Sequence, residues 1–530
     1  MSARLKHPLI RRVSRSVVFS YDGQALPAIE GETIAAALAA NGIAALRQAR
    51  DGQRRGLYCG MGACQECLVT VDGQASQRAC MTKVERGQVV RSSMPQAGED
   101  DPLRPLVPAA GAAPVEVHVD LLVIGAGPAG LSAALAARRA GASVSILDER
   151  LEPGGQYYKP LAPSHRSASP ADKQFAQGLA LTREVTDAGV ELVQGAQVWA
   201  AESPREVAAI VAGRATLYRC RQLIVAPGAY ERPVPFPGWT LPGVMTTGAG
   251  QTLARAYRVS PGQRVLIAGN GPLNLQLAAE LLAGGAHVVA VLESAARPGL
   301  RAWRDLLQAA FTAPDLLADG AKYMAVLRRH RVPVLWSHGV VRAEGDARVA
   351  RVQVARLDAQ GSAVAGSAKV FEADALCLGY GFIPSTELAR MLGCRHEYVA
   401  RHLGYGATAI EEDGRTDVPG VFVVGDGADL GGSRVALARG ALAGAAAARN
   451  LGLQAPEPAG SLGALRRAQS FQRALWSIYQ APPVRLDQVP DSTLLCRCED
   501  ISFGSVREQI AAGHDTLAAI KRNTRLGMGR

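Results

Sequence analysis

The stretch Asp120-Leu-Leu-Val-Ile-Gly125-Ala-Gly127-Pro-Ala-Gly130 decides the fold of the largest part of this chain. An apolar run followed by Gly-x-Gly-x-x-Gly predicts a strand that passes through a tight loop into a helix. In such a loop Gly125 makes the turn, Gly127 lets a pyrophosphate approach the backbone, and Gly130 lets the helix pack closely on the strand. The N-terminal end of that helix attracts phosphate through its partial positive charge. The stretch therefore predicts a dinucleotide-binding fold.

The next predicted strand supplies the acidic residue that such a fold needs. It runs from Ser143 to Leu147 and is followed by Asp148 and Glu149, where a ribose-binding carboxylate is expected. We favour Glu149, because it precedes Gly154-Gly155-Gln156 at the spacing usual in flavoproteins. Asp148 is the alternative.

Later motifs favour FAD over a nicotinamide nucleotide at this site. The run Thr416 to Asp426 resembles the flavoprotein Gly-Asp motif, whose carboxylate reaches the ribityl chain, and Leu223 to Gly228 predicts the crossover strand. The predicted FAD site comprises Gly125, Gly127, Pro128, Ala129, Gly130, Asp148, Glu149, Gly154, Gly155, Gln156, Gly228, Gly425 and Asp426.

A second copy of the fingerprint begins at Arg264 and predicts a second Rossmann-type domain, inserted into the first. Its nucleotide contacts are expected at Gly269, Gly271 and Glu293, and an acid at the end of the strand favours NAD(H) over NADP(H). Asn274 replaces the third glycine, so we expect a displaced helix and a narrower cleft. A nucleotide domain without a role in turnover is the alternative.

The strongest local signal is Cys59-Gly-Met-Gly-Ala-Cys64-Gln-Glu-Cys67, with Cys80 further on. This C-x4-C-x2-C run plus a distant cysteine is the plant-type [2Fe–2S] pattern. Small residues let the loop wrap the cluster and aim backbone N–H groups at the sulfurs. A structural zinc is the alternative, although zinc sites favour paired C-x2-C knuckles. Short strands around one helix, which is expected from Thr33 to Asn41, predict a β-grasp domain.

Composition excludes several classes of protein. The net charge of +11 comes from scattered arginines without aromatic interleaving, so we do not expect nucleic-acid binding. The most apolar stretch, Val119 to Ala137, contains turn glycines and an aspartate, so we expect no membrane span. With no visible secretory signal, and four of nine cysteines in one metal-type cluster, we expect a cytoplasmic protein without disulfides. The second Rossmann repeat has no Cys-x2-Cys, and no Cys pair follows Gly154, which argues against a thioredoxin- or glutathione-reductase role.

The chain resembles a known family. Residues 13–91 are similar to the ferredoxin-like module of heteromeric sarcosine oxidase, opine oxidase and hydroxyproline dehydrogenase. The matching sequence segments are Gly31-Glu-Thr33, Tyr58-Cys-Gly-Met-Gly62, Glu66-Cys-Leu-Val-Thr70, Val71-Asp-Gly73 and Arg78-Ala-Cys80-Met-Thr82. From residue 13 to 530 the chain resembles the large subunit of heteromeric amino-acid or amine dehydrogenases. This group includes opine oxidase, hydroxyproline and proline dehydrogenase, hydrogen cyanide synthase and the N-terminal half of sarcosine oxidase alpha.

The resemblance implies a function and a partner. A separate D-amino-acid-oxidase-like flavoprotein subunit would oxidise a secondary amine, and this chain would pass the electrons through FAD and [2Fe–2S] to an acceptor. FMN at the interface of a hetero-oligomer is implied too. A self-contained NADH:acceptor reductase and a non-catalytic assembly subunit are the alternatives. No residue presents itself as a substrate base or nucleophile, so no catalytic residue is assigned.

The C-terminal segment resembles the bacterioferritin-associated-ferredoxin-like end of the same subunits. Cys496 and Cys498 are its expected metal ligands, and in relatives a second Cys pair follows the Gly-Met-Gly that ends here at Gly529. Two thiolates alone cannot hold a [2Fe–2S] cluster. We expect either a truncated sequence or a degenerate module.

The expected fold class is multidomain α/β and α+β. The expected division is a ferredoxin-like domain at 1–93, a linker at 94–115, the FAD-binding domain at 116–245 and 372–455, an inserted NAD(P)-binding-like domain at 246–371, a helical linker at 456–490, and a partial [2Fe–2S]-like module at 491–530.

Overall fold

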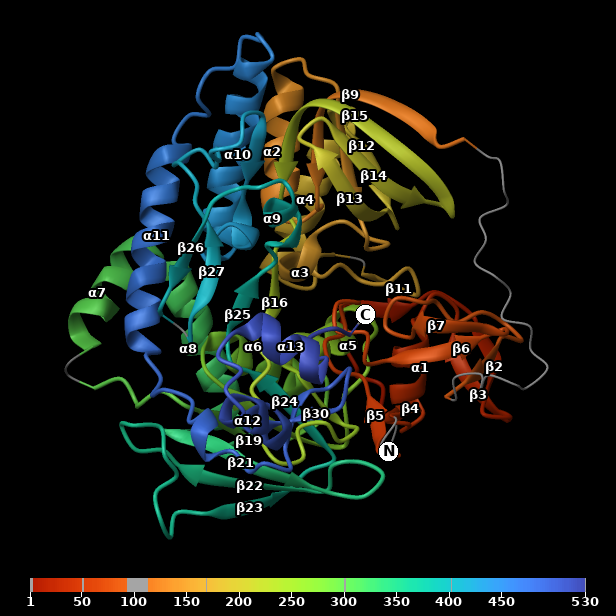
Figure 1. The fold of residues 1–530 in the computed structure, drawn as a ribbon, viewed down its shortest axis with the longest axis vertical. Helices are drawn as coiled ribbons and strands as arrows, with labels where there is room; N and C mark the ends of the chain where they lie inside the picture. Colours follow the sequence, from red (N-terminus) through yellow and green to blue (C-terminus); the bar gives the residue numbers. More distant parts are fainter. Residues whose placement is uncertain are drawn as a thin grey trace.

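The computed structural model describes residues 3–49, 52–92, 113–167, 169–299, 302–401 and 403–529. Most of the linker expected at 94–115 lies outside these residues. Figure 1 shows an N-terminal ferredoxin-like unit (residues 3–92) in red and orange beside the lower part of the molecule. A first Rossmann unit, built around β9 and β15, lies above a second one, built around β24 and β19.

The ferredoxin-like unit is a mixed five-stranded sheet in the order β3-β2-β8-β6-β7, with one helix. Thr33 caps that helix, because its side chain accepts from the N–H of Ala36 at 3.3 Å. The helix therefore begins where the sequence predicts. The elements are β2 (Ser16–Tyr21), β3 (Gln24–Ile29), α1 (Ile34–Ala40), β4 (Ala45–Gln48), β5 (Arg54–Gly56), β6 (Leu68–Val71), β7 (Gln74–Arg78) and β8 (Val89–Arg91).

The first Rossmann unit has a seven-stranded sheet in the order β12-β10-β9-β15-β14-β13, with β28 beside β15. Although β28 lies far along the chain, it pairs in parallel with β15, so residues on both sides of the second repeat share this sheet. The elements are β9 (Val115–Ile124), α2 (Pro128–Arg139), β10 (Val144–Asp148), α3 (Gly155–Tyr158), α4 (Lys173–Asp187), β12 (Glu191–Gln194), β13 (Gln197–Ser203), β14 (Glu206–Val211), β15 (Arg214–Val225), β28 (Val421–Val423), the short helix η2 (Gly425–Gly427) and α10 (Gly432–Asn450).

The second Rossmann unit has a five-stranded parallel sheet in the order β17-β24-β18-β19-β20. Its strand β24, which pairs with both β17 and β18, follows residue 371, so the sheet extends past the end expected for the inserted domain. A short buried apolar run gives no local signal of the sheet it joins. The elements are β17 (Val244–Thr246), α5 (Thr247–Ala256), β18 (Arg264–Gly269), α6 (Pro272–Ala283), β19 (His287–Glu293), α7 (Trp303–Thr312), α8 (Pro314–Arg329), β20 (Val334–Trp336), β21 (His338–Glu344), β22 (Arg351–Arg356), β23 (Lys369–Glu372) and β24 (Ala375–Gly379).

Shorter elements join the units and form a C-terminal module (residues 491–529). They are β1 (Ile10–Arg12) with β11 (His165–Ser167), β16 (Ala229–Glu231) with β25 (Phe382–Pro384), α9 (Glu387–Met391), β26 (His396–Val399) with β27 (Tyr405–Thr408), α11 (Ser461–Ile478), the short helix η3 (Leu486–Gln488), β29 (Leu494–Cys496) with β30 (Ile501–Ser502), α12 (Phe503–Ala511) and α13 (Leu517–Thr524).

One hydrophobic core runs from the ferredoxin-like unit into the second Rossmann unit. Phe19 and Leu38 belong to the same buried cluster as Leu253 and Leu281. The two units therefore pack against each other as parts of one body. Cys220, Cys377 and Cys394 are buried free cysteines.

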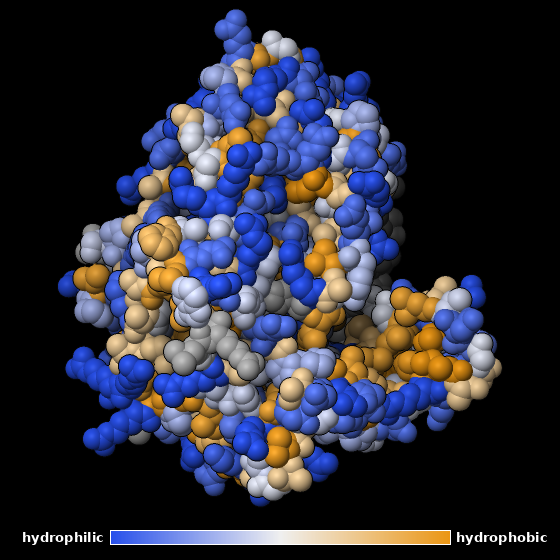
Figure 2. All heavy atoms as spheres, turned by 90° about the vertical axis from the view of Figure 1, so that its left-hand side faces the viewer, coloured by the Kyte–Doolittle hydropathy of each residue, from blue (hydrophilic) through white to orange (hydrophobic). Residues whose placement is uncertain are grey.

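The described helices include none that is long and apolar enough to cross a membrane. The surface is mainly hydrophilic in Figure 2, with hydrophobic patches and a hollow. Helix α7 lies on the side of the molecule that this view turns toward the reader, and Trp303, Leu307 and Phe311 are exposed on it.

Glycines let α10 cross α2 at very short range. A side-chain carbon at Gly444 would overlap the carbonyl oxygen of Ala133, and one at Gly440 would overlap that of Ala129. The N-terminal end of α2 is the predicted phosphate-binding end, so this crossing supports the nucleotide loop.

We expect the substitution Gly444→Ala to lower the free energy of unfolding by roughly 1–3 kcal/mol, because the helices must move apart. Gly463→Ala is the matched control, since this glycine of α11 has only the tip of Arg467 within 4 Å. The control should be neutral or more stable by roughly 0.5–1 kcal/mol. Thermal unfolding of both variants checks this, and equal midpoints would contradict the close crossing.

Candidate functional site

A cavity of about 1350 Å³ lies where the two Rossmann units and the ferredoxin-like unit meet. Most of the residues predicted to bind FAD line it, and only Gly130 and Gly154 of that set do not. Gly269, Gly271 and Glu293, which were predicted to bind a second nucleotide, lie outside its wall. The predicted residues on its wall are Gly125, Gly127, Pro128, Ala129, Asp148, Glu149, Gly155, Gln156, Gly228, Gly425 and Asp426.

The three fingerprint glycines have the geometry that their predicted roles require. Gly125 has a φ of 108°, in the region that favours glycine, and a side chain there would overlap the carbonyl oxygen of Ala226. A side chain at Gly130 would overlap the carbonyl oxygen of Gly125. A Cβ at Gly127 would meet its nearest neighbour, the Cα of Gly155, only at 4.0 Å. Gly127 is thus the position where a ligand can approach the backbone.

The two candidate ribose carboxylates lie in different environments. Asp148 is buried, and its oxygens accept from the N–H groups of Ala126 (2.5 Å) and Arg150 (2.7 Å). Burial raises the pKa of this carboxyl. Glu149 is 43% exposed, lines the cavity and pairs with Arg78 at 2.5 Å. Asp148 therefore holds the glycine loop, and Glu149 is the carboxylate available to a ligand.

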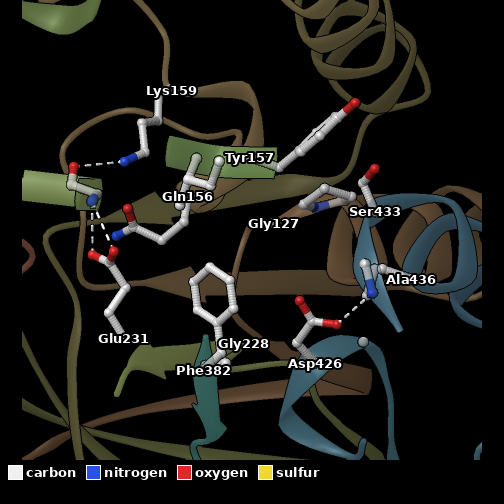
Figure 3. Close-up of a pocket in the computed structure, with 18 of the residues that line it drawn as sticks. Gly127, Gln156, Tyr157, Lys159, Gly228, Glu231, Phe382, Asp426, Ser433 and Ala436 are labelled. Atoms are coloured by element: carbon white, nitrogen blue, oxygen red, sulfur yellow. Dashed lines mark hydrogen bonds between the residues drawn. The ribbon is translucent and has the colours of Figure 1, made fainter. Parts of the chain in front are cut away.

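Asp426 is fixed by the start of α10. Its Oδ1 accepts from the N–H groups of Gly431 (2.9 Å) and Gly432 (2.8 Å). Burial raises the pKa of the carboxyl. Figure 3 shows the carboxylate in the cavity wall opposite Gly127 and Ser433. This placement suits a carboxylate that meets the middle of an extended dinucleotide.

The four cysteines of the N-terminal loop fall into two contacting pairs, Cys59 with Cys64 and Cys67 with Cys80. The hydrogen bond from the Cys64 thiol, with backbone N–H groups, lowers the pKa of Cys59 to about 6. The N–H groups of Met61 (3.5 Å) and Cys64 (3.4 Å) point at the Cys59 sulfur. Among the described residues no three or more His, Cys, Asp or Glu side chains surround one ion position. Two thiol pairs with N–H groups aimed at sulfur fit a two-iron cluster better than a single zinc.

This cysteine loop is also part of the cavity wall. Met61, Ala63, Gln65 and Arg78 line the same cavity as the predicted flavin residues. Arg78 donates to the carbonyl oxygen of Gly62 at 3.0 Å and also pairs with Glu149. One guanidinium therefore contacts both candidate cofactor sites.

The same wall contains Lys159 and Glu231, which both bind the backbone of Gly248 and which no sequence motif indicates. Lys159 Nζ donates to the carbonyl oxygen of Gly248 (2.8 Å) and to Thr252 Oγ1 (3.2 Å), while both Glu231 oxygens accept from the N–H of Gly248 (Figure 3). Desolvation lowers the pKa of Lys159 and raises that of Glu231, which favours the neutral form of each group. In the sequence, the one local feature that Lys159 and Glu231 share is that each follows a predicted glycine motif.

In the second repeat, the polar groups of the fingerprint bind the chain itself. Glu293 accepts from the N–H groups of Gly271 and Ala295 and from Asn270 Nδ2, each at 2.8 Å. Asn270 Nδ2 also donates to the carbonyl oxygen of Tyr479 at 2.9 Å, and the Tyr479 ring stacks on Trp336. The polar groups that were expected to bind a ribose therefore already form hydrogen bonds within the chain.

Asn274 does more than replace a packing glycine. Its Nδ2 donates to the carbonyl oxygen of Gly379 at 3.1 Å, and its Oδ1 accepts from Thr247 Oγ1 at 2.7 Å. The side chain thus ties α6 to the end of β24 and the start of α5.

Cys496 and Cys498 lie with their sulfurs 3.4 Å apart. The Cys498 thiol, with backbone N–H groups including that of Gly527, lowers the pKa of Cys496 to about 5. No third metal-binding side chain joins them within the described residues. The pair supplies two ligands of the four that a [2Fe–2S] cluster needs.

Comparison with known proteins defines the class. Residues 119–448 match the family described as pyridine nucleotide-disulphide oxidoreductase, and residues 14–95 match the 2Fe-2S iron-sulfur cluster binding domain. The chain belongs to the pyridine nucleotide-disulphide oxidoreductase family, with a 2Fe-2S domain ahead of its FAD-type fold. The fold class is confirmed for these two parts.

Similarity to individual proteins is more informative than the match to these two families. The chain is 33% identical to an opine oxidase subunit of Agrobacterium tumefaciens (strain Ach5), over 78% of its own length and 82% of that protein. It is 30% identical to hydrogen cyanide synthase subunit HcnB of Pseudomonas aeruginosa, over 77% and 89%. An L-proline dehydrogenase from P. horikoshii shares the fold, with a TM-score of 0.69 at 20% identity over 99% and 91% of the two chains. The resemblance found in the sequence is confirmed.

We expect Gly127→Val to fold normally but to be purified with little flavin, because the new side chain occupies space beside the phosphate-binding backbone. Gly406→Val is the control, since nothing lies within 4 Å of its Cβ position, which is outside the cavity. Flavin absorbance per chain and the unfolding midpoint are the measurements. Stoichiometric FAD in the Gly127 variant would show that the pyrophosphate binds elsewhere.

Proposed function

We propose that this chain is the electron-transferring subunit of a heteromeric amino-acid or amine oxidoreductase in the cytoplasm. A D-amino-acid-oxidase-like flavoprotein partner oxidises the substrate, and this chain passes the electrons through FAD and [2Fe–2S] to an acceptor. One observation carries the proposal: Met61, Ala63, Gln65 and Arg78, beside the cluster ligands, line the same cavity as the flavin-binding glycines. The relatives support it, since both are subunits of oxidases or synthases.

The site residues take the following roles in this proposal. The N-terminal end of α2 and the backbone at Gly127 bind the pyrophosphate, Glu149 binds the ribose, and Asp426 binds the ribityl chain. Cys59 and Cys64 hold one iron, and Cys67 and Cys80 hold the other. A bound flavin takes up electrons in pairs, and a [2Fe–2S] cluster takes one at a time.

A bound flavin that passed electrons to a cluster would also have to release a proton. Lys159 Nζ and the Glu231 carboxyl, both in the cavity wall, would be placed to hold that proton, since desolvation moves the pKa of each toward neutrality. The hydrogen bonds of Gly248 fix both groups, so proton uptake requires no rearrangement of the wall.

A self-contained NADH reductase is the weaker candidate. It needs a nicotinamide crevice whose polar groups face the ligand, whereas Glu293 and Asn270 bind backbone groups and Tyr479. We therefore propose that the second Rossmann unit serves mainly to dock the ferredoxin-like unit.

The cluster assignment predicts that Cys64→Ser loses the EPR signal of a reduced [2Fe–2S] cluster and destabilises the ferredoxin-like unit, because ligation contributes to its folding. Cys394→Ser is the matched control, since Cys394 is a buried free cysteine that lies outside the loop. Iron and sulfide analysis accompanies the EPR spectrum. Two irons per chain and an unchanged signal in the Cys64 variant would exclude this ligand set.

The choice of electron donor separates the two enzyme hypotheses. We expect NADPH to reduce the flavin weakly or not at all, and NADH only slowly, because a misplaced nicotinamide cannot approach the flavin for hydride transfer. The complete complex should reduce it readily from an amine substrate. Stopped-flow absorbance with and without the partner flavoprotein makes the comparison. Rapid reduction of the isolated chain by NADH would favour the reductase instead.

A further inference from the structure

A buried glutamate in the cysteine loop collects three arginines. Glu66 lies between Cys64 and Cys67 and is 2% exposed. Its Oε1 pairs with Arg47 at 2.8 Å and lies 3.7 Å from Arg55 Nε, and its Oε2 pairs with Arg497 at 2.9 Å. The Arg55 and Arg497 side chains are also buried. Three guanidinium groups therefore surround the Glu66 carboxylate.

Arg497 comes from the C-terminal module, more than four hundred residues away along the chain. Its guanidinium lies over the ring of Tyr58 (4.0 Å to the centroid) and that of Trp239 (4.8 Å), and its Nη1 donates to the Trp239 carbonyl oxygen at 3.1 Å. Tyr58 directly precedes the ligand Cys59. The module thus inserts one fixed cation beside the cluster loop.

The same module also supplies an anion. Asp500 Oδ1 accepts from Arg55 Nη2 at 2.9 Å, and the Asp500 side chain is 14% exposed. Among the described residues, the network comprises the cations Arg47, Arg55 and Arg497 and the anions Glu66 and Asp500. Charges buried in this way are poorly screened by salt and act at longer range than surface pairs.

A [2Fe–2S] cluster with four thiolates is anionic, and it gains one more negative charge when it takes an electron. A nearby buried cation stabilises the reduced form more than the oxidised form, and a nearby anion does the opposite. Net charge and hydrogen bonds to sulfur are among the factors that set cluster potentials.

We propose that the C-terminal module tunes the N-terminal cluster, with Arg497 raising its reduction potential and Asp500 lowering it. Both are positioning residues, since neither is a ligand. Arg497 then favours electron uptake by the cluster, while Asp500 opposes it. The inference rests on the cluster assignment made under the proposed function, and it adds a role for a segment whose own metal ligands are incomplete among the described residues.

The test is an EPR-monitored redox titration of the full chain and of single variants. Arg497→Met should shift the cluster potential by about 59 mV to more negative values. For one electron, this shift is about a tenfold change in the equilibrium constant for electron transfer from the donor. Asp500→Asn should shift it to more positive values, because the amide keeps an acceptor for Arg55 but loses the charge. Arg497→Lys should restore most of the parent potential. Arg525→Met removes an exposed arginine that pairs with Glu499 in the same module and should leave the potential unchanged.

The potential shifts expected for Arg497→Met and Asp500→Asn have opposite signs, and this distinguishes an effect of charge from a disturbance of the fold. A variant that only loosens the loop moves the potential in one direction whichever charge is removed, so shifts of equal sign, or none, would overturn the proposal. If Arg497→Met does not retain its cluster, the positive shift of Asp500→Asn still decides the question. The iron and sulfide content of the parent chain is measured first. A parent chain without iron and sulfide would refute the assignment of the cluster and not the tuning of its potential.

Discussion

The arrangement of the molecule depends on how closely the cysteine loop approaches helix α5. A Cβ at Gly60 would lie 2.9 Å from the Ala249 Cα, and the N–H of Thr246 donates to the Tyr58 carbonyl oxygen at 2.8 Å. Only a loop without a side chain at this point, in a backbone conformation with a φ of 63°, can lie flat on the helix. This contact brings Met61, Ala63 and Gln65 of the cysteine loop to the wall of the cavity, and the continuous core beneath it packs the two units together.

Charges buried around this contact are the second constraint. A buried ion is costly unless it is paired and hydrogen-bonded, so such groups tend to be retained for a function and not for stability. Lys159 and Glu231 lie on the cavity side of the contact, where the proposed function would use them to take up a proton. Glu66 and its arginines lie in and beside the cysteine loop, where the proposed cluster would receive an electron.

Local motifs predicted much of this organisation. The roles of Gly125, Gly127 and Gly130 follow from their spacing, because a tight strand–helix turn imposes the same backbone geometry wherever it occurs. The cap at Thr33 and the loop that carries Cys59, Cys64 and Cys67 are local for the same reason. Asp148 was harder to assign, since sequence cannot tell a carboxylate that holds the loop from its neighbour that faces the cavity. The role of Glu293 was equally hard to predict. Its carboxylate accepts a hydrogen bond from the side chain of Asn270, and the nucleotide fingerprint does not specify the residue at that position.

Pairs between distant segments could not be predicted. Nothing near Glu66 indicates Arg497, and nothing near Lys159 indicates Glu231, since such pairs are set by the packing of whole units. Strand β24 likewise belongs to a sheet that its own sequence does not identify.

The central claim is that flavin and cluster exchange electrons within one chain, and flash photoreduction of the flavin in the purified chain tests it most directly. The account predicts that the cluster absorbance bleaches as the flavin is reoxidised, in a first-order phase whose rate does not depend on protein concentration. A rate that rises in proportion to protein concentration, or a cluster that stays oxidised, would contradict it.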